Sequence, residues 1–299
     1  MTLIERLKLL LISVKISPQI SAITFFLIVA VTSSTASGIG RVSHSWSDIN
    51  TRNVIRWEGD TAVVSRESYA KDLTCRFYID LRKVVGAIED YGIPSQWTLI
   101  SYRNQQELAI KQLELQVRAA THGIKVMEDN RFIVDYTWVI DRSVNDLRDV
   151  ARSIRSTAIA SGYRSRRELI GAFTSFVQSL EYRIPPNHRV DDDGEKILTA
   201  GVMMPLETLT KGWGDCDSKS LLFATLIRCV DLVDVCFIVI DNHLFVGVQT
   251  PPNQGDHVIR HNRRDWVLVE LCDAWQIGRI PMDHYNDITH GNYEVVDLD

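Results

Sequence analysis

One stretch of the sequence combines a cysteine with the local features that make a thiol reactive. Residues 212–215 form a turn with two glycines that leads into Cys216, and a run of apolar residues typical of a helix follows at 221–227. A cysteine in the first turn of a helix meets unpaired backbone N–H groups and the positive end of the helix dipole, and both favour the thiolate. The sequence therefore predicts a nucleophile at Cys216. The flanking Asp217 and Lys219 are expected to face solvent or to pair locally.

Two later residues are suited to serve this nucleophile. His243 stands at the entry to a strand expected over residues 244–249, and Glu270 lies near the end of another over residues 266–271. A thiolate nucleophile needs an imidazole within hydrogen-bond reach, and the imidazole needs an acceptor that fixes its tautomer. We therefore expect an α+β fold in which the cysteine helix packs on an antiparallel sheet that carries His243 and Glu270.

Three segments around these residues resemble the transglutaminase-like superfamily of cysteine peptidases. They read Gly-x-Gly-Asp-Cys-Asp-Ser-Lys, Asn-His-Leu-Phe-Val-Gly-Val and Val-Leu-Val-Glu-Leu-Cys-Asp-Ala-Trp-Gln-Ile-Gly. The resemblance covers residues 143–278 and follows the family's order of cysteine, histidine and acid. It implies a papain-like α+β fold with Cys216 as nucleophile, His243 as base and Glu270 as the orienting acid. The family usually has aspartate in the third role, so Asp273 is the alternative acid.

Acyl transfer also needs preset donors for the negative charge of the tetrahedral intermediate. The backbone N–H of Cys216 is one candidate because it lies at a helix start. The side-chain amide of Gln178, on an upstream helix, is expected to be the second. Trp213 would either donate its indole N–H or line the substrate cleft, and simple packing is its alternative role.

Metal binding is the main competing chemistry. His257 and His261 have the i, i+4 spacing of a helical metal pair, but their neighbours are typical of a loop and the sequence offers no third ligand nearby. Cys216, His243 and Cys272 are residue types that bind Zn²⁺. We rank thiol chemistry first and expect no metal and no cofactor.

The first forty residues differ from the rest of the chain. Basic residues precede an apolar stretch that ends in small residues at 32–38, which is the pattern of an export signal. Residues 16–40 carry no charge and are also long enough for a membrane anchor. We therefore expect export, with residues 1–38 acting as a cleaved signal peptide or as an anchor in the inner membrane. The rest of the chain would then be periplasmic.

Composition limits the classes of function. The 299 residues carry a formal net charge of −5, and no basic block is dense enough to indicate nucleic-acid binding. Five scattered cysteines are too few for a disulfide framework, and their odd number leaves at least one unpaired.

Two folded regions are expected after the export segment. Residues 39–140 would form an α+β region of unassigned role, and residues 141–299 the catalytic domain. Helices are expected at 69–91, 104–122, 143–160 with Ser143 as N-cap, 165–180 and after Cys216. Strands are expected at 97–100, 125–127, 131–140, 235–240, 244–249 and 266–271. Residues 41–60 and 250–264 are expected to be irregular.

These features together predict an exported cysteine hydrolase. It would be a peptidase or amidase that cleaves peptide or isopeptide bonds through an acyl-enzyme, and transfer of the acyl group to an amine would use the same chemistry. The envelope compartment favours a protein or a cell-wall peptide as substrate. The alternative is a non-catalytic envelope module that keeps the transglutaminase-like fold and binds a partner through residues 41–140.

Overall fold

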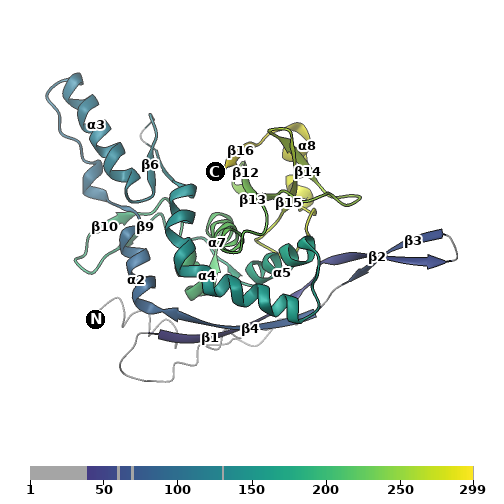
Figure 1. Ribbon diagram of the computed structural model, residues 1–299. Coiled ribbons are helices and arrows are strands. Elements are labelled where there is room, and N and C mark those ends of the chain that lie inside the picture. Colours follow the sequence, from purple (N-terminus) through teal and green to yellow (C-terminus); the bar gives the residue numbers. More distant parts are fainter. Residues whose placement is uncertain (1–38, 59–60, 69–70, 130, 299) are drawn as a thin grey trace, which may run out of the picture.

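The protein is a mixed α+β structure (Figure 1). The computed structural model describes residues 39–298 except 59–60, 69–70 and 130. Its strand pairs are antiparallel except for the two-residue pair β8–β11, which is parallel. Among the described helices, none has the length and hydropathy needed to cross a membrane. The predicted export segment, residues 1–38, lies outside the described residues.

The largest sheet has five strands in the order β14-β15-β13-β12-β16. Their bounds are Val258–His261, Arg264–Val269, His243–Val248, Val235–Ile240 and Glu294–Asp297. Three of these strands confirm the predictions made from β-branched runs at 235–240, 244–249 and 266–271. The stretch 250–264, expected to be irregular, contains β14, because residues 258–261 pair with β15.

The central helix is α7, Cys216–Cys229. It packs against β13 of the sheet on one side and against α4 and α5 on the other (Figure 1). All residues from Leu221 to Ile227 are buried. A helix that is buried all round belongs in the core of a domain, so the position of its first residue is fixed by packing on several sides.

The N-terminal region is more ordered in secondary structure than the sequence predicts. Strand β1, Ile39–Asp48, pairs along its whole length with β4, Lys71–Asp80, and β2, Thr51–Glu58, forms a hairpin with β3, Thr61–Ser68, that extends away from the body (Figure 1). The predictions of an irregular stretch at 41–60 and a helix from residue 69 are therefore wrong. In β4 alternate residues are buried, which is the period of a strand. The helix α2, Leu81–Asp90, begins only after Asp80, whose carboxylate accepts the backbone N–H of Arg82.

Two further boundaries differ from the predictions. Residues 95–98 form a 3-10 turn, η1, Ser95–Thr98, where a strand was expected at 97–100. The strand expected at 131–140 is only β7, Phe132–Val134, because Asp135 caps the following helix by accepting the N–H of Trp138. That helix, α4, spans Tyr136–Ala160, so Ser143 is a buried interior residue rather than an N-cap.

The remaining elements are short or match the predictions. The helix expected at 104–122 is α3, capped by Asn104, and the helix expected at 165–180 is α5, which begins with a capping box at Ser165. Their bounds and those of the other elements are α3 Gln105–Ala120, α5 Arg166–Gln178, α6 Pro205–Lys211, α8 Tyr285–His290, η2 Met282–His284, β5 Ile93–Pro94, β6 Ile124–Val126, β8 Glu181–Tyr182, β9 His188–Val190, β10 Lys196–Leu198 and β11 Trp213–Gly214.

One hydrophobic core joins residues from both sides of the expected domain boundary. Trp46 on β1 is 2% exposed and packs edge-on against Phe176 of α5, with ring centroids 5.1 Å apart. Its indole N–H donates to Ser175 Oγ at 3.2 Å. The boundary placed at 140–141 lies inside α4.

The end of β1 also holds the segment that follows Glu270. The buried Asp48 accepts hydrogen bonds from the backbone and side chain of Asn50, at 2.9 and 2.8 Å, and from the hydroxyl of Tyr163 at 2.8 Å. Asn50 in turn accepts the backbone N–H of Ile277 at 2.9 Å. The N-terminal strands therefore position a loop that belongs to the candidate site.

We expect Trp46→Ala to lower the free energy of unfolding of the whole chain by about 3–5 kcal/mol, because a large aromatic side chain is removed from a closed core. Denaturant unfolding followed by circular dichroism measures the change. Tyr78→Ala, on the paired strand β4 but 66% exposed, is the control and should have a small effect. A separate early transition that alone responds to Trp46→Ala would show that residues 39–140 fold independently.

Candidate active site

Cys216 is the first residue of α7, as the sequence predicts. The preceding helix ends at Gly212, which adopts a left-handed conformation with φ of 73° that favours glycine. At Gly214 an added Cβ would lie 3.0 Å from the side chains of Thr208 and Ser218, so a larger residue would have to displace them. Asp215 is the N-cap and accepts the N–H of Ser218 at 3.0 Å. The two glycines and this cap place the thiol at the helix N-terminus.

His243 and Glu270 come together at adjacent strand ends. His243 is the first residue of β13, Glu270 directly follows β15, and these two strands pair. The imidazole Nε2 lies 2.7 Å from Glu270 Oε2, and the two side chains are 10% and 2% exposed. Asp273, the alternative acid, is exposed, and its carboxylate accepts the N–H of Ala274. Glu270 is therefore the acid in contact with the imidazole.

His243 also interacts with the thiol of Cys216, and this interaction shifts the pKa of both groups. Because Nε2 faces Glu270, Nδ1 is the nitrogen left for the sulfur. Burial alone would lower the pKa of His243, but the hydrogen bonds with Cys216 and Glu270 raise that pKa to about 9. The pKa of Cys216 is lowered to about 7 by hydrogen bonding with Cys272, against burial and with a contribution from His243. The arrangement favours a thiolate beside an imidazolium.

Glu270 keeps its charge although it is buried. Burial would raise the pKa of its carboxyl group, but the hydrogen bond with His243 and the contacts with Cys272 lower that pKa. Its second oxygen, Oε1, accepts the backbone N–H of Cys272 at 2.6 Å. With both oxygens occupied by donors, the carboxylate has one orientation and fixes the imidazole ring.

Cys272 has a place in the site that the sequence did not assign. Its thiol interacts with Cys216, and together with burial this interaction raises the pKa of Cys272 well above that of an ordinary thiol. The second thiol is thus the protonated partner of the pair. From the sequence alone, Cys272 is only a residue type that can bind a metal. Its interaction with Cys216 brings the loop after β15 to the start of α7, and only the folded structure reveals it.

Two aromatic rings enclose the imidazole. Phe245, two residues along β13, meets it edge-on with centroids 4.5 Å apart and an interplanar angle of 75°. His284 of η2 stacks on its face at 4.6 Å and 5°. These contacts restrict rotation of the His243 ring. Phe245 lies on the same face of β13 as His243 because side chains alternate along a strand, whereas nothing in the sequence pointed to His284.

Lys219 is fully buried beneath the site, which corrects the expectation that it faces solvent. One turn after Cys216, its ammonium group reaches three backbone carbonyl oxygens, and burial lowers its pKa to about 8. The acceptors are Leu180, Leu271 and Cys272, at 2.7, 3.3 and 3.5 Å. Lys219 therefore ties the loop that follows Glu270 to the helix that carries the nucleophile.

Asp217 is also held by the protein. It is half-buried and accepts a hydrogen bond from the Tyr136 hydroxyl at 2.5 Å, while its other oxygen lies 3.5 Å from Cys216 Sγ. Its charge raises the pKa of Cys216 and so opposes the hydrogen bonds that lower it.

Gln178 does not occupy the place of an oxyanion donor. Its Nε2 donates to the backbone carbonyls of Glu270 and Trp275, both at 2.8 Å, so both N–H bonds of the amide are used. Gln178 therefore holds the loop that follows Glu270 in place instead of donating to an oxyanion as the sequence had suggested. Trp213, directly before the turn, is half-buried, and the cations of Arg183 and Lys211 lie 5.1 and 5.4 Å from its ring centroid. Its ring packs among these side chains beside the nucleophile.

The histidine pair at 257 and 261 does not lie on a helix, which agrees with the non-helical neighbours seen in the sequence. His261 is the last residue of β14 and His257 directly precedes that strand, so the two are not on one helical face. His261 pairs instead with Asp297 at 3.1 Å. In the described part of the chain, the ligand atoms that cluster within 4.8 Å and include a histidine belong to His243, Glu270 and Cys272.

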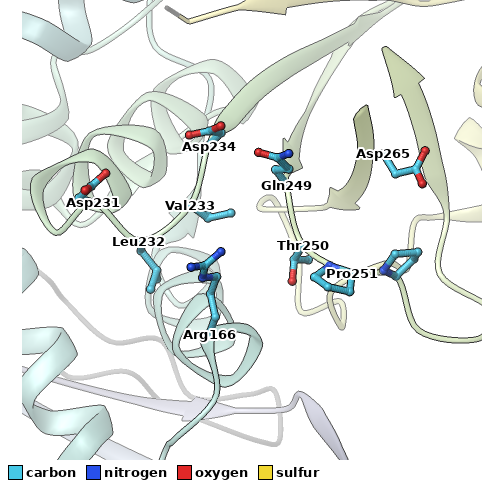
Figure 2. Close-up of a pocket in the computed structure, with 10 residues that line it drawn as sticks. Arg166, Asp231, Leu232, Val233, Asp234, Gln249, Thr250, Pro251 and Asp265 are labelled. Atoms are coloured by element: carbon cyan, nitrogen blue, oxygen red, sulfur yellow. The ribbon is translucent and has the colours of Figure 1, made fainter. Parts of the chain in front are cut away.

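A cavity of about 590 Å³ lies at the other end of α7 (Figure 2). Its lining includes Arg166, Asp231 and Asp234 together with Gln249 and Thr250. Asp231 and Asp234 of its lining follow the C-terminal end of α7, whereas Cys216 is the first residue of that helix. Because a helix of 14 residues is about 20 Å long, the cavity is far from Cys216. Its lining carries no nucleophile, and we do not assign it to the candidate active site.

We expect iodoacetamide to label Cys216 faster than the other cysteines, with an apparent pKa below the free-thiol value of about 8.5. Burial raises the pKa of Cys75 and Cys236 to about 12 and that of Cys229 to about 11, so these thiols should react slowly. Labelling of the reduced full-length chain as a function of pH, followed by peptide mass mapping, measures the rates. The fast phase should vanish in Cys216→Ser and persist in the control Cys229→Ser. Equal rates at Cys216 and Cys75 would contradict an activated thiolate.

Comparison with known proteins gives no match. No protein-family model matches the chain, and no curated protein or solved structure is significantly similar to it. The functional interpretation rests on the geometry of the site and on the sequence motifs that surround it.

Proposed function

We propose that this protein is an exported cysteine hydrolase of the transglutaminase-like, papain-like type that cleaves peptide or isopeptide bonds through an acyl-enzyme. The observation that carries the proposal is the buried pair of His243 and Glu270, in which the imidazole lies 2.7 Å from the carboxylate and interacts electrostatically with the Cys216 thiol. The position of Cys216 at the start of α7, packed on the sheet that carries His243 and Glu270, supports the fold assignment. Export follows only from the sequence of residues 1–38.

The first half of the reaction forms a thioester. The Cys216 thiolate attacks the carbonyl carbon of the substrate, and the carbonyl π electrons move to the oxygen. The backbone N–H of Cys216, the first residue of α7, has no acceptor within its own helix and would donate to this developing charge. His243 then gives the proton on Nδ1 to the leaving amine as the C–N bond breaks. Glu270 stabilises the imidazolium and keeps its ring in place.

The second half releases the acyl group. Neutral His243 accepts a proton from a water molecule, whose oxygen attacks the thioester, and the S–C bond breaks to regenerate the thiolate. An amine that replaces this water would give acyl transfer by the same steps. The described residues favour neither acceptor.

A binding role for the N-terminal region is the alternative, and one observation favours it. Helix α3 exposes Ile110, Leu113 and Val117, at 52%, 60% and 61%, along one face. An apolar stripe of this kind suits contact with a partner. In the non-catalytic alternative this surface would be the function, whereas in the hydrolase it would serve substrate or partner recruitment.

We expect p-nitrophenyl acetate, a general acyl donor, to acetylate Cys216 and release p-nitrophenol in a burst. His243→Ala should lower the acylation rate by about 10²–10⁴-fold because it removes the base. Burst absorbance and intact mass measure acylation, and circular dichroism checks the fold. Full acylation of His243→Ala would mean that another group is the base.

The third member of the triad can be tested with matched substitutions. Glu270→Gln should lower turnover by about 10²-fold or more, because an amide cannot stabilise the imidazolium as a carboxylate does. Asp273→Asn, three residues away and exposed, should leave turnover unchanged. Steady-state turnover of the same ester decides between them, and a larger loss in Asp273→Asn would reverse the assignment.

Turnover should follow a bell-shaped pH profile. It should rise as pH passes through about 7, where Cys216 loses its proton, and fall as pH passes through about 9, where His243 loses the proton needed by the leaving group. A peptide amide substrate is required, because its amine leaving group depends on that proton. Alkylation by iodoacetamide needs only the thiolate and should stay high above pH 9. A turnover profile that keeps rising with pH would show that His243 is not the acid.

A further inference from the structure

The cavity beyond the C-terminal end of α7 brings together side chains from three parts of the fold (Figure 2). Arg166 is the first residue of α5, Asp231 lies in the turn after α7, and Gln249 and Thr250 directly follow β13. The backbone N–H of Gln249 donates to the carbonyl of Asp234 at 3.0 Å, which holds the segment after β13 against the turn after α7. The walls of the cavity are therefore joined to one another before any ligand binds.

Four polar side chains of the lining are available to a ligand. Among the described residues, none offers a hydrogen-bond or ion-pair partner to the side chains of Arg166, Asp231, Gln249 or Thr250. Thr250 is only 5% exposed, and a hydroxyl in such a position is usually hydrogen-bonded. Its Oγ1 borders the cavity and is not sealed in the interior, so a ligand in the cavity can supply the partner.

The charges of the lining favour a ligand that carries both signs. The two other aspartates are each paired with an arginine of the adjacent strands, as Arg264–Asp234 at 3.0 Å and Arg260–Asp265 at 3.7 Å. Arg166 and Asp231 are left with opposite charges and no ion pair in the described part of the chain. A guanidinium group binds a carboxylate through two parallel N–H bonds, and a carboxylate accepts hydrogen bonds from an ammonium group. A zwitterion therefore complements both groups.

A metal ion matches this cavity less well. The clusters of possible metal ligands found in the described residues do not include the aspartates of the lining. The unpaired guanidinium of Arg166 would also repel a cation that entered the cavity.

The size and the neutral groups of the cavity favour a short peptide. Its volume of about 590 Å³ lies within the range of about 300–1,000 Å³ that is typical of ligand pockets. The amide of Gln249 can both donate and accept, as a peptide group requires. Leu232 and Val233, also in the lining, offer apolar surface to small side chains.

We propose that this cavity is a second binding site, separate from the candidate active site, for short peptides whose two ends are free. Arg166 binds the terminal carboxylate and Asp231 binds the terminal ammonium group. Gln249 and Thr250 hydrogen-bond to the peptide groups between the two ends. The site does not use Cys216, so binding there is independent of the proposed hydrolase.

The test is a titration of the full-length chain with trialanine, followed by saturation-transfer NMR of the peptide methyl groups. The chain carries Cys216→Ser so that the peptide is not consumed. We expect saturable binding of trialanine. Trialanine amide and N-acetyl-trialanine should each bind about tenfold more weakly or worse, because each loses one hydrogen-bonded charge pair.

Matched substitutions identify the residue that binds each end of the peptide. Arg166→Gln should weaken trialanine by about tenfold or more and remove the difference between trialanine and its amide. Asp231→Asn should do the same for the difference between trialanine and its N-acetyl form. Asp231 has a left-handed φ of 47°, a conformation that asparagine also tolerates, so this exchange preserves the turn.

Thr250→Val tests the buried hydroxyl without a change of shape and should weaken all three peptides by a similar factor. The controls are Arg155→Gln on α4 and Asp192→Asn, which remove exposed charges outside the cavity and should bind as the parent chain does. Circular dichroism of each variant checks that it is folded.

Two results would overturn the proposal. The first is amide and N-acetyl forms that bind as tightly as trialanine, since the free ends would then not be recognised. The second is trialanine binding that is unchanged in both Arg166→Gln and Asp231→Asn, which would place the peptide elsewhere, including at the candidate active site. Neither result bears on acylation of Cys216, so the two proposals fail separately.

Discussion

The hydrogen bond between His243 and Glu270 is the interaction on which the candidate site depends. A carboxylate that is 2% exposed needs donors to remain charged, and Glu270 has the imidazole on one oxygen and the Cys272 N–H on the other. Once Nε2 is committed to the carboxylate, only Nδ1 can face Cys216. The direction of proton transfer and the tautomer of the base therefore follow from one buried acid.

Two buried polar side chains, Lys219 and Asn50, and the half-buried Gln178 hold this acid in place. Lys219 and Gln178 both donate to backbone carbonyls of residues 270–275, and Asn50 accepts the N–H of Ile277. The loop that follows Glu270 has little regular structure, so its peptide groups must be satisfied by side chains. These donors and acceptors come from α7, α5 and the end of β1. The N-terminal strands are thus packed and hydrogen-bonded to the segment that carries the candidate site.

Local signals were sufficient for part of this structure. The turn glycines, the N-cap at Asp215 and the apolar run after it place Cys216 at a helix start, and the β-branched runs identify β12, β13 and β15. The prediction of a helix was wrong at residues 71–80, because Leu73 and Phe77 satisfy both a helical spacing and a strand alternation, and pairing with β1 decides between them. The contacts of Lys219, Cys272 and His284 join residues far apart in sequence, so periodicity and propensity contain no information about them. Only the assembled fold shows Gln178 facing two carbonyls instead of a substrate.

Cys272 links the candidate nucleophile to the loop that carries the candidate acid. Its thiol is the largest factor that lowers the pKa of Cys216, since a protonated sulfur beside a thiolate can donate to it. The backbone N–H of Cys272 also donates to Glu270 Oε1 at 2.6 Å, so this one residue contacts the acid through its main chain and acts on Cys216 through its side chain. The orientation of the acid and the acidity of the Cys216 thiol therefore both depend on the short loop that follows β15.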